Sequence, residues 1–120
     1  MTVDTLVSHL TEWSEGLNDL EKQATKELYD NNNETAYRDL MRRRAELLRS
    51  LPERATGLPQ PLRAAADFPS VLETLRGFAQ NADNALRLDS IFYMSALLYP
   101  DEHTPGEPNN LELLIRELTR

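Results

Sequence analysis

The chain has 120 residues, no cysteine and a formal net charge of −7 at pH 7. This length fits a single domain with its own core, and the lack of cysteine excludes a disulfide framework and a thiolate metal site. The net acidity argues against a nucleic acid as the main partner. No apolar run approaches the ~20 residues of a membrane span, and the first residues lack the basic start of a signal peptide, so we expect no membrane contact and a cytoplasmic protein.

Charge is arranged in three blocks. Residues 1–37 carry eight acidic residues and two lysines, residues 38–63 carry seven arginines and three acidic residues, and residues 64–120 carry nine acidic residues and four arginines. This pattern predicts a basic second helix between two acidic neighbours. Asp39 and Arg43, four positions apart, are expected to pair on a solvated face of that helix. An acidic peptide or RNA is the alternative partner for these arginines.

Leucine, alanine, glutamate and arginine dominate the chain, and no alternation of period two is present, so the sequence predicts an all-α fold. A first helix is expected near residues 3–30, and the asparagine-rich segment that follows it should end it and start a second helix at 34–51. The two would form an antiparallel hairpin over residues 3–51. Apolar residues at alternating spacings of three and four mark the core face of the first helix: Val3, Leu6, Leu10, Trp13, Leu17, Leu20, Ala24 and Leu28.

Part of this hairpin resembles a known family. The stretch Leu17–Leu51, LNDLEKQATKELYDNNNETAYRDLMRRRAELLRSL, is similar to the helical hairpin of flagellar export chaperones, with a glutamate-rich first helix, a short polar turn and a second helix of spaced leucines around basic residues. The resemblance covers under a third of the chain and does not extend to its C-terminal half.

The middle of the chain is expected to contain a crossover linker at residues 52–69, in which Pro52 stops or kinks the second helix. A long helix should follow at 70–99, started by Asp67 or Ser70. Its final nine residues, from Ile91 to Tyr99, form the most apolar run of the chain. One face of this helix is expected to carry Val71, Leu75, Phe78, Ala82, Ala85, Asp89, Phe92 and Ala96.

The C-terminal part is expected to be a loop at residues 100–108 and a short helix at 109–119, started by Asn109 or Asn110. We expect this helix to pack over the surface between Phe92 and Leu98. The sequence as a whole therefore predicts an all-α, four-helix up-and-down bundle with two long helices, one medium helix and a short C-terminal helix. The apolar stripe of the last helix consists of Leu111, Leu114, Ile115 and Leu118.

A search for catalytic and metal-binding patterns favours a protein that is not an enzyme. The two histidines, His9 and His103, have no second histidine at helical spacing, and His103 lies in a proline-rich stretch. No glycine-rich phosphate loop and no nucleophile with a histidine base are present. We therefore expect no metal ion, no cofactor and no catalytic residue.

Two charged residues occupy positions where the helical rhythm calls for an apolar side chain. These are Arg44 in the second helix and Asp89 in the long helix. A buried charge is costly unless it is paired, so the two could form an internal polar pair. The alternative is that both lie at the edge of their apolar faces and extend to water.

The function that the sequence favours is protein–protein interaction, as an adaptor, an assembly factor or a chaperone-like binder. A partner's amphipathic helix would dock near Ile91–Tyr99, and a homodimer is also expected because the apolar surface exceeds what four unequal helices can cover. The alternative is a ligand-binding or enzymatic bundle that uses the Arg44 and Asp89 pair. The expected partner-binding residues are Phe92, Tyr93, Met94, Leu97, Leu98, Leu111, Leu114, Ile115 and Leu118.

Overall fold

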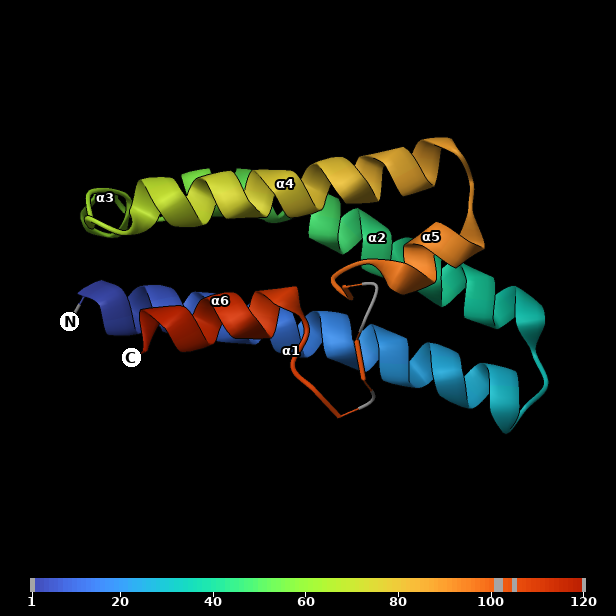
Figure 1. The fold of residues 1–120 in the computed structure, drawn as a ribbon. Helices are drawn as coiled ribbons and strands as arrows, with labels where there is room; N and C mark the ends of the chain where they lie inside the picture. Colours follow the sequence, from blue (N-terminus) through green and yellow to red (C-terminus); the bar gives the residue numbers. More distant parts are fainter. Residues whose placement is uncertain (1, 101–102, 105, 120) are drawn as a thin grey trace.

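The fold, seen in a computed structural model that describes residues 2–100, 103–104 and 106–119, is all-α: helices joined by turns and loops, with no strand in this part of the chain (Figure 1). This confirms the predicted fold class. The described residues form six helices instead of the expected four. Their bounds are α1 Thr2–Tyr29, α2 Glu34–Thr56, α3 Gln60–Arg63, α4 Phe68–Arg87, α5 Ile91–Ala96 and α6 Asn110–Leu118.

The long helix α2 is central to the packing, because it contacts both α1 and α4 (Figure 1). The short helix α3 lies at one end of the molecule, next to the start of α4, and α5 packs against α2 and α4 near the other end. The last helix, α6, lies along α1, so the two chain termini are at the same end. The prediction that the basic helix lies between two acidic neighbours is confirmed on one side only, because α1 is acidic whereas the acidic and basic residues of α4 balance.

The first hairpin forms as predicted. Asn32 has a left-handed backbone conformation, with φ 51°, which ends the turn after α1. The side chain of Asn33 then accepts a hydrogen bond from the backbone N–H of Ala36 and caps α2. The predicted core face of α1 is buried at Leu6, Leu10, Leu17 and Ala24 and partly buried at Trp13, Leu20 and Leu28, while the side chain of Val3 is outside the described set.

The second helix does not end at residue 51. It passes through Pro52 and continues to Thr56, so the predicted linker at 52–69 shrinks to residues 57–67 with the short α3 inside it. A proline within a helix removes one backbone hydrogen bond and costs about 3 kcal/mol. The apolar spacing runs from Leu51, just before the proline, to Ala55 and Leu58 beyond it, and all three residues are buried. This packing offsets the missing hydrogen bond.

The predicted helix at 70–99 is two helices. The chain leaves α4 at Leu88, Asp89 adopts a left-handed conformation with φ 50°, and Ser90 caps α5 by accepting a hydrogen bond from the N–H of Tyr93. Two further bonds, from Asp89 N to Leu86 O and from Ser90 N to Ala85 O, complete a Schellman motif. The predicted face holds at Val71, Leu75, Ala82 and Ala85, which are buried, but Asp89, Phe92 and Ala96 are exposed.

The C-terminal helix begins as predicted but packs elsewhere. Asn109 caps it, and Glu112 returns a hydrogen bond to the backbone of Asn109, which completes a capping box. The expected docking of this helix over Phe92–Leu98 is wrong, because α6 packs along α1 and buries Leu111 there. The predicted loop at 100–108 precedes it, although residues 101, 102 and 105 lie outside the described part.

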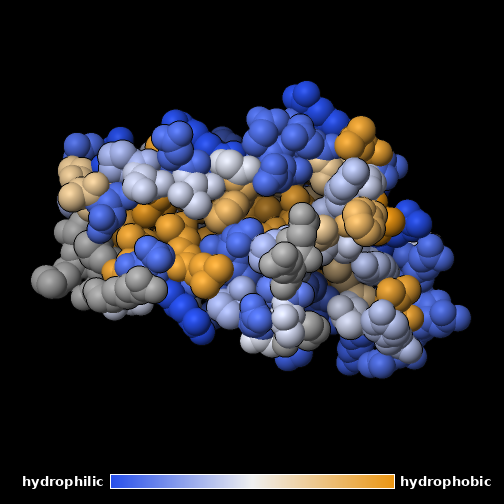
Figure 2. All heavy atoms as spheres, in the orientation of Figure 1, coloured by the Kyte–Doolittle hydropathy of each residue, from blue (hydrophilic) through white to orange (hydrophobic). Residues whose placement is uncertain are grey.

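The face drawn in Figure 2 carries a band of apolar side chains between α4 and α6. This arrangement follows from the lengths of the two helices, since α6 has 9 residues and α4 has 20. A short helix can cover only part of the surface that a longer neighbour presents. Several apolar residues around the core are consequently only partly buried: Leu72, Phe78, Leu86, Leu114, Ile115 and Leu118.

Candidate functional site

Arg44 of α2 lies in the core with no exposed surface. Its guanidinium donates to two backbone carbonyls at the end of α5, those of Met94 (3.3 Å) and Leu97 (3.0 Å). The same group lies 3.2 Å from the Glu21 carboxylate of α1 and 5.7 Å from the centre of the Tyr99 ring. Burial lowers the pKa of Arg44 from its ordinary value, and the nearby Glu21 carboxylate partly opposes this.

Tyr99 completes this cluster. Its hydroxyl donates to the Glu21 carboxylate, with oxygen–oxygen distances of 2.5 and 2.7 Å. Burial raises the pKa of Tyr99 above its ordinary value, and the hydrogen bond to Glu21 raises it further. We call Glu21, Arg44 and Tyr99 the Arg44 cluster. It ties α1 and α2 to the segment that follows α5.

The predicted pair of Arg44 and Asp89 does not form. Asp89 lies on the surface, where its carboxylate pairs with Arg42, while Arg44 pairs with Glu21. Arg42 and Arg44 point to different sides of α2, because neighbouring positions on a helix do not share a face. The alternative function that relied on an Arg44 and Asp89 pair therefore loses its structural basis.

The Arg44 cluster fixes a strained segment. Leu98 has a backbone φ of 74°, a left-handed conformation that costs a leucine about 1–2 kcal/mol. Its carbonyl accepts a hydrogen bond of 2.8 Å from the backbone N–H of Asn110, and the carbonyl of the preceding Leu97 accepts from Arg44. These two bonds hold Leu98 from both sides. The Arg44 cluster therefore helps to fix the backbone of Leu97 and Leu98, which follow α5.

Most of the other arginines of α2 form ion pairs on the surface, whereas Arg54 donates a hydrogen bond to the Ser50 hydroxyl. Arg43 pairs with Asp39, as predicted, and Arg38 pairs with Glu34. Arg49 reaches across to Asp83 of α4. Exposed ion pairs of this kind contribute little stability, but they neutralise the basic stripe that the sequence shows.

An exposed apolar patch lies where α4 turns into α5. The exposed fractions of its three large side chains are 66% for Leu88, 72% for Phe92 and 54% for Tyr93. The rings of Phe92 and Tyr93 meet edge to face, with their centres 5.5 Å apart. We call these three residues the corner patch. It exists because the Schellman motif turns α5 away from the direction of α4, so the apolar stripe of the sequence leaves the core there.

The structure divides the predicted partner-binding residues into three groups. Phe92 and Tyr93 are exposed. The four residues Met94, Leu97, Leu98 and Leu111 are buried in the core, and Leu114, Ile115 and Leu118 are partly buried on α6. Leu88 was missed by the sequence analysis, because a continuous helix would have placed it beside the core stripe.

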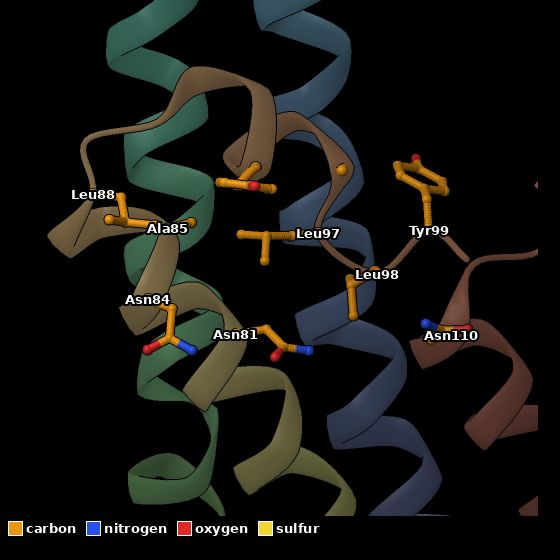
Figure 3. A pocket seen from close by; sticks show the side chains of 10 residues that line it. Asn81, Asn84, Ala85, Leu88, Leu97, Leu98, Tyr99 and Asn110 are labelled. Atoms are coloured by element: carbon orange, nitrogen blue, oxygen red, sulfur yellow. The ribbon is translucent and has the colours of Figure 1, made fainter. Parts of the chain in front are cut away.

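A pocket of about 370 Å³ opens beside the corner patch (Figure 3). Its walls are α4, α5 with the segment that follows it, and the start of α6. The described residues that line it are Asn81, Asn84, Ala85, Leu88, Tyr93, Ala96, Leu97, Leu98, Tyr99 and Asn110. None of these ten side chains carries a charge at neutral pH.

The described residues offer no arrangement typical of a metal site, since no three histidine, aspartate or glutamate side chains gather among them. His9 lies near the Trp13 ring on α1, and His103 packs against the Tyr99 ring, with ring centres 4.6 Å apart. In the part of the chain that is described, no helix is long and apolar enough to cross a membrane.

Comparison of the chain with family models, with curated proteins and with solved structures finds no match. The resemblance of Leu17–Leu51 to the hairpin of flagellar export chaperones therefore stays a prediction. Function has to be argued from the geometry of the corner patch and the pocket beside it.

Proposed function

We propose that this chain is a non-enzymatic protein–protein interaction module, acting as an adaptor, assembly factor or chaperone-like binder. The observation that carries the proposal is the exposure of the corner patch, Leu88, Phe92 and Tyr93. Large aromatic side chains supply much of the binding energy at protein interfaces, and they are costly to leave in water. A protein partner that covers the corner patch would remove these side chains from water, and their burial would contribute binding energy.

Charged groups around the patch suit an interface of ordinary composition. The ion pair of Arg42 and Asp89 lies at the turn between α4 and α5, next to the apolar residues. Apolar centres with a polar, hydrated rim are usual for protein interfaces. The partner would therefore meet aromatic side chains first and a charged edge around them.

The test is site-specific photo-crosslinking, with benzoylphenylalanine in place of Phe92 in cells of the protein's source. We expect one defined crosslinked polypeptide, because a patch of three large side chains selects one surface. The control position is Glu73, which is exposed on α4 toward the opposite end of the molecule. Equal products from both positions, or none from Phe92, would contradict the proposal.

A second measurement separates binding from folding. Phe92→Ser removes an exposed side chain, so the free energy of unfolding should change by less than about 0.5 kcal/mol. The crosslink formed from a benzoylphenylalanine at the neighbouring Tyr93 should nevertheless be lost in this variant. If it persists, Phe92 does not contribute to the interface.

A further inference from the structure

The pocket beside the corner patch is lined only by uncharged side chains. Of all residues in the chain, 28% are charged, yet the ten described residues that line the pocket are all uncharged. Its apolar lining includes Ala85, Leu97 and Leu98, and amide side chains from α4 and α6 lie along one edge (Figure 3). Its volume of about 370 Å³ falls within the ~300–1,000 Å³ that is usual for small-ligand sites.

Three asparagines supply those amides: Asn81 and Asn84 from α4 and Asn110 from α6. Asn84 accepts a hydrogen bond from Gln80 through its carbonyl oxygen, which leaves its N–H groups available. Within the described part of the chain, the side-chain amides of Asn81 and Asn110 have no hydrogen-bond partner. An amide side chain both donates and accepts, which matches the pairing groups of a peptide bond.

The shape of the pocket is fixed by the Arg44 cluster. Arg44 holds the carbonyl of Leu97, and Asn110 holds the carbonyl of Leu98, so the strained backbone forms one rigid wall. Strained residues that their surroundings hold in place are concentrated at binding and active sites. A wall that is fixed before binding also reduces the entropy lost when a ligand enters.

We propose that this pocket binds an uncharged segment of a partner polypeptide, with one apolar side chain against the apolar lining and the flanking peptide groups bonded to Asn81, Asn84 and Asn110. This inference rests on the proposed function and names the chemistry of the partner. The occupant is a polypeptide because the pocket is continuous with the corner patch: Leu88 and Tyr93 belong to both. A chain that crosses the patch therefore passes directly over the pocket.

The experiment is a titration followed by the ¹H–¹⁵N spectrum of the full chain, with N-acetyl-leucine methylamide as the probe. We expect saturable shifts of the side-chain amide signals of Asn81, Asn84 and Asn110, with a Kd in the millimolar range that small ligands of this size reach. Free leucine, which carries two charges, should bind at least tenfold more weakly. Equal binding of the two probes, or shifts elsewhere, would overturn the proposal.

Two substitutions test the parts of the pocket. Ala96→Leu places a larger side chain at an exposed lining position and should raise the Kd of the probe at least tenfold. The control is Ala66→Leu, at an exposed position at the opposite end of the molecule, which should leave this Kd unchanged. Asn84→Leu should weaken the probe about tenfold through loss of one amide. An unchanged Kd of the probe for Asn84→Leu would show that the asparagines do not recognise the peptide group.

A longer probe tests continuity with the corner patch. N-acetyl-Leu-Phe-Leu methylamide should bind at least threefold more tightly than the single capped leucine, and Phe92→Ser should remove that gain while leaving the single leucine unaffected. If the gain is absent, the pocket takes a free small amide and the polypeptide assignment is wrong. Crosslinking at Phe92 is measured without any probe, so it can fail or succeed independently of this pocket.

Discussion

At the residue scale, Arg44 is the side chain whose environment the sequence predicted in part. Its place in the apolar rhythm of the second helix predicted a buried charge, and the structure buries it completely. Its partners could not be predicted, because Glu21 lies outside the main apolar stripe of α1 and Tyr99 follows the break after α5. A contact between three segments so far apart in sequence depends on how the helices pack. Asp89 misled the prediction because the helix was assumed to be continuous.

The pairing of Arg44 predicts a specific coupling. Arg44→Met should lower the free energy of unfolding by about 3 kcal/mol or more, because it removes the cationic partner of Glu21 and leaves two carbonyls without their donor. A double-mutant cycle with Glu21→Ala should show a coupling of at least about 1 kcal/mol, measured by urea denaturation. The comparison cycle with Asp89→Ala should be additive to within about 0.5 kcal/mol. Additive effects in the Glu21 cycle would show that the buried pair contributes nothing.

Tyr99 predicts how stability depends on pH. The pKa of its hydroxyl is raised in the folded state by burial and by the bond to Glu21, so folding favours the neutral form. This contribution is fully present below pH 10, the ordinary pKa of tyrosine, where both states are neutral. Above pH 10 the unfolded chain loses its proton while folded Tyr99 keeps it, so stability falls as pH rises.

Tyr99→Phe should therefore cost about 1–2 kcal/mol at pH 7, from loss of a hydrogen bond to a carboxylate, and should flatten the decline in stability above pH 10. The measurement is urea denaturation between pH 8 and pH 11. Tyr29→Phe is the matched control, since Tyr29 is 78% exposed, and it should keep the slope of the wild-type protein. An unchanged slope in Tyr99→Phe would rule out Tyr99 as the titrating group.

At the scale of single elements, helices whose apolar rhythm is bounded by good caps were predictable. The hairpin of α1 and α2 and the start of α6 formed as expected, because the asparagines at their ends cap in the way their chemistry favours. The errors concern helix ends within apolar runs. Packing carries α2 through Pro52, and the Asp89–Ser90 pair ends one helix and starts another inside a stretch that reads as continuous. The two polar residues Asp89 and Ser90 mark this helix end in the sequence, but the apolar spacing on either side of them favours a continuous helix.

The break between α4 and α5 predicts an effect of the Ser90 side chain. Ser90→Ala should cost about 1 kcal/mol of stability, because the N–H of Tyr93 loses the oxygen that caps it. Ser70→Ala is the control, since α4 begins at Phe68 and Ser70 lies inside its first turn; it should cost less than about 0.5 kcal/mol. The measurement is urea denaturation followed by circular dichroism. Equal costs at the two positions would mean that the cap does not stabilise α5.

At the scale of the whole molecule, the sequence predicted an exposed apolar surface near Ile91–Tyr99, and Phe92 and Tyr93 are exposed there, but the rest of that run is mostly buried or half-buried. The expected cover for the Ile91–Tyr99 run was the last helix, which instead lies along α1. A nine-residue helix of this kind is held by packing and not by its own stability, so its place is decided by the best available groove. The asparagines Asn109 and Asn110 predicted where the helix starts, but a capping residue carries no information on which helix it meets.

The corner patch leads to an expectation for the isolated protein, because exposed apolar side chains favour association. In the absence of a partner, we expect a homodimer at micromolar concentration in which the patch of one copy covers that of the other. An interface of this kind is two-fold symmetric, so Phe92 would face the same region of the second copy.

Sedimentation equilibrium should give a mass near twice that of the chain, falling toward the monomer on dilution. Phe92→Ser should be monomeric throughout, whereas Leu113→Ser, an exposed leucine on α6, should still dimerise. A wild-type chain that stays monomeric at high concentration would exclude self-association, and a dimeric Phe92→Ser variant would place the dimer contact outside the corner patch.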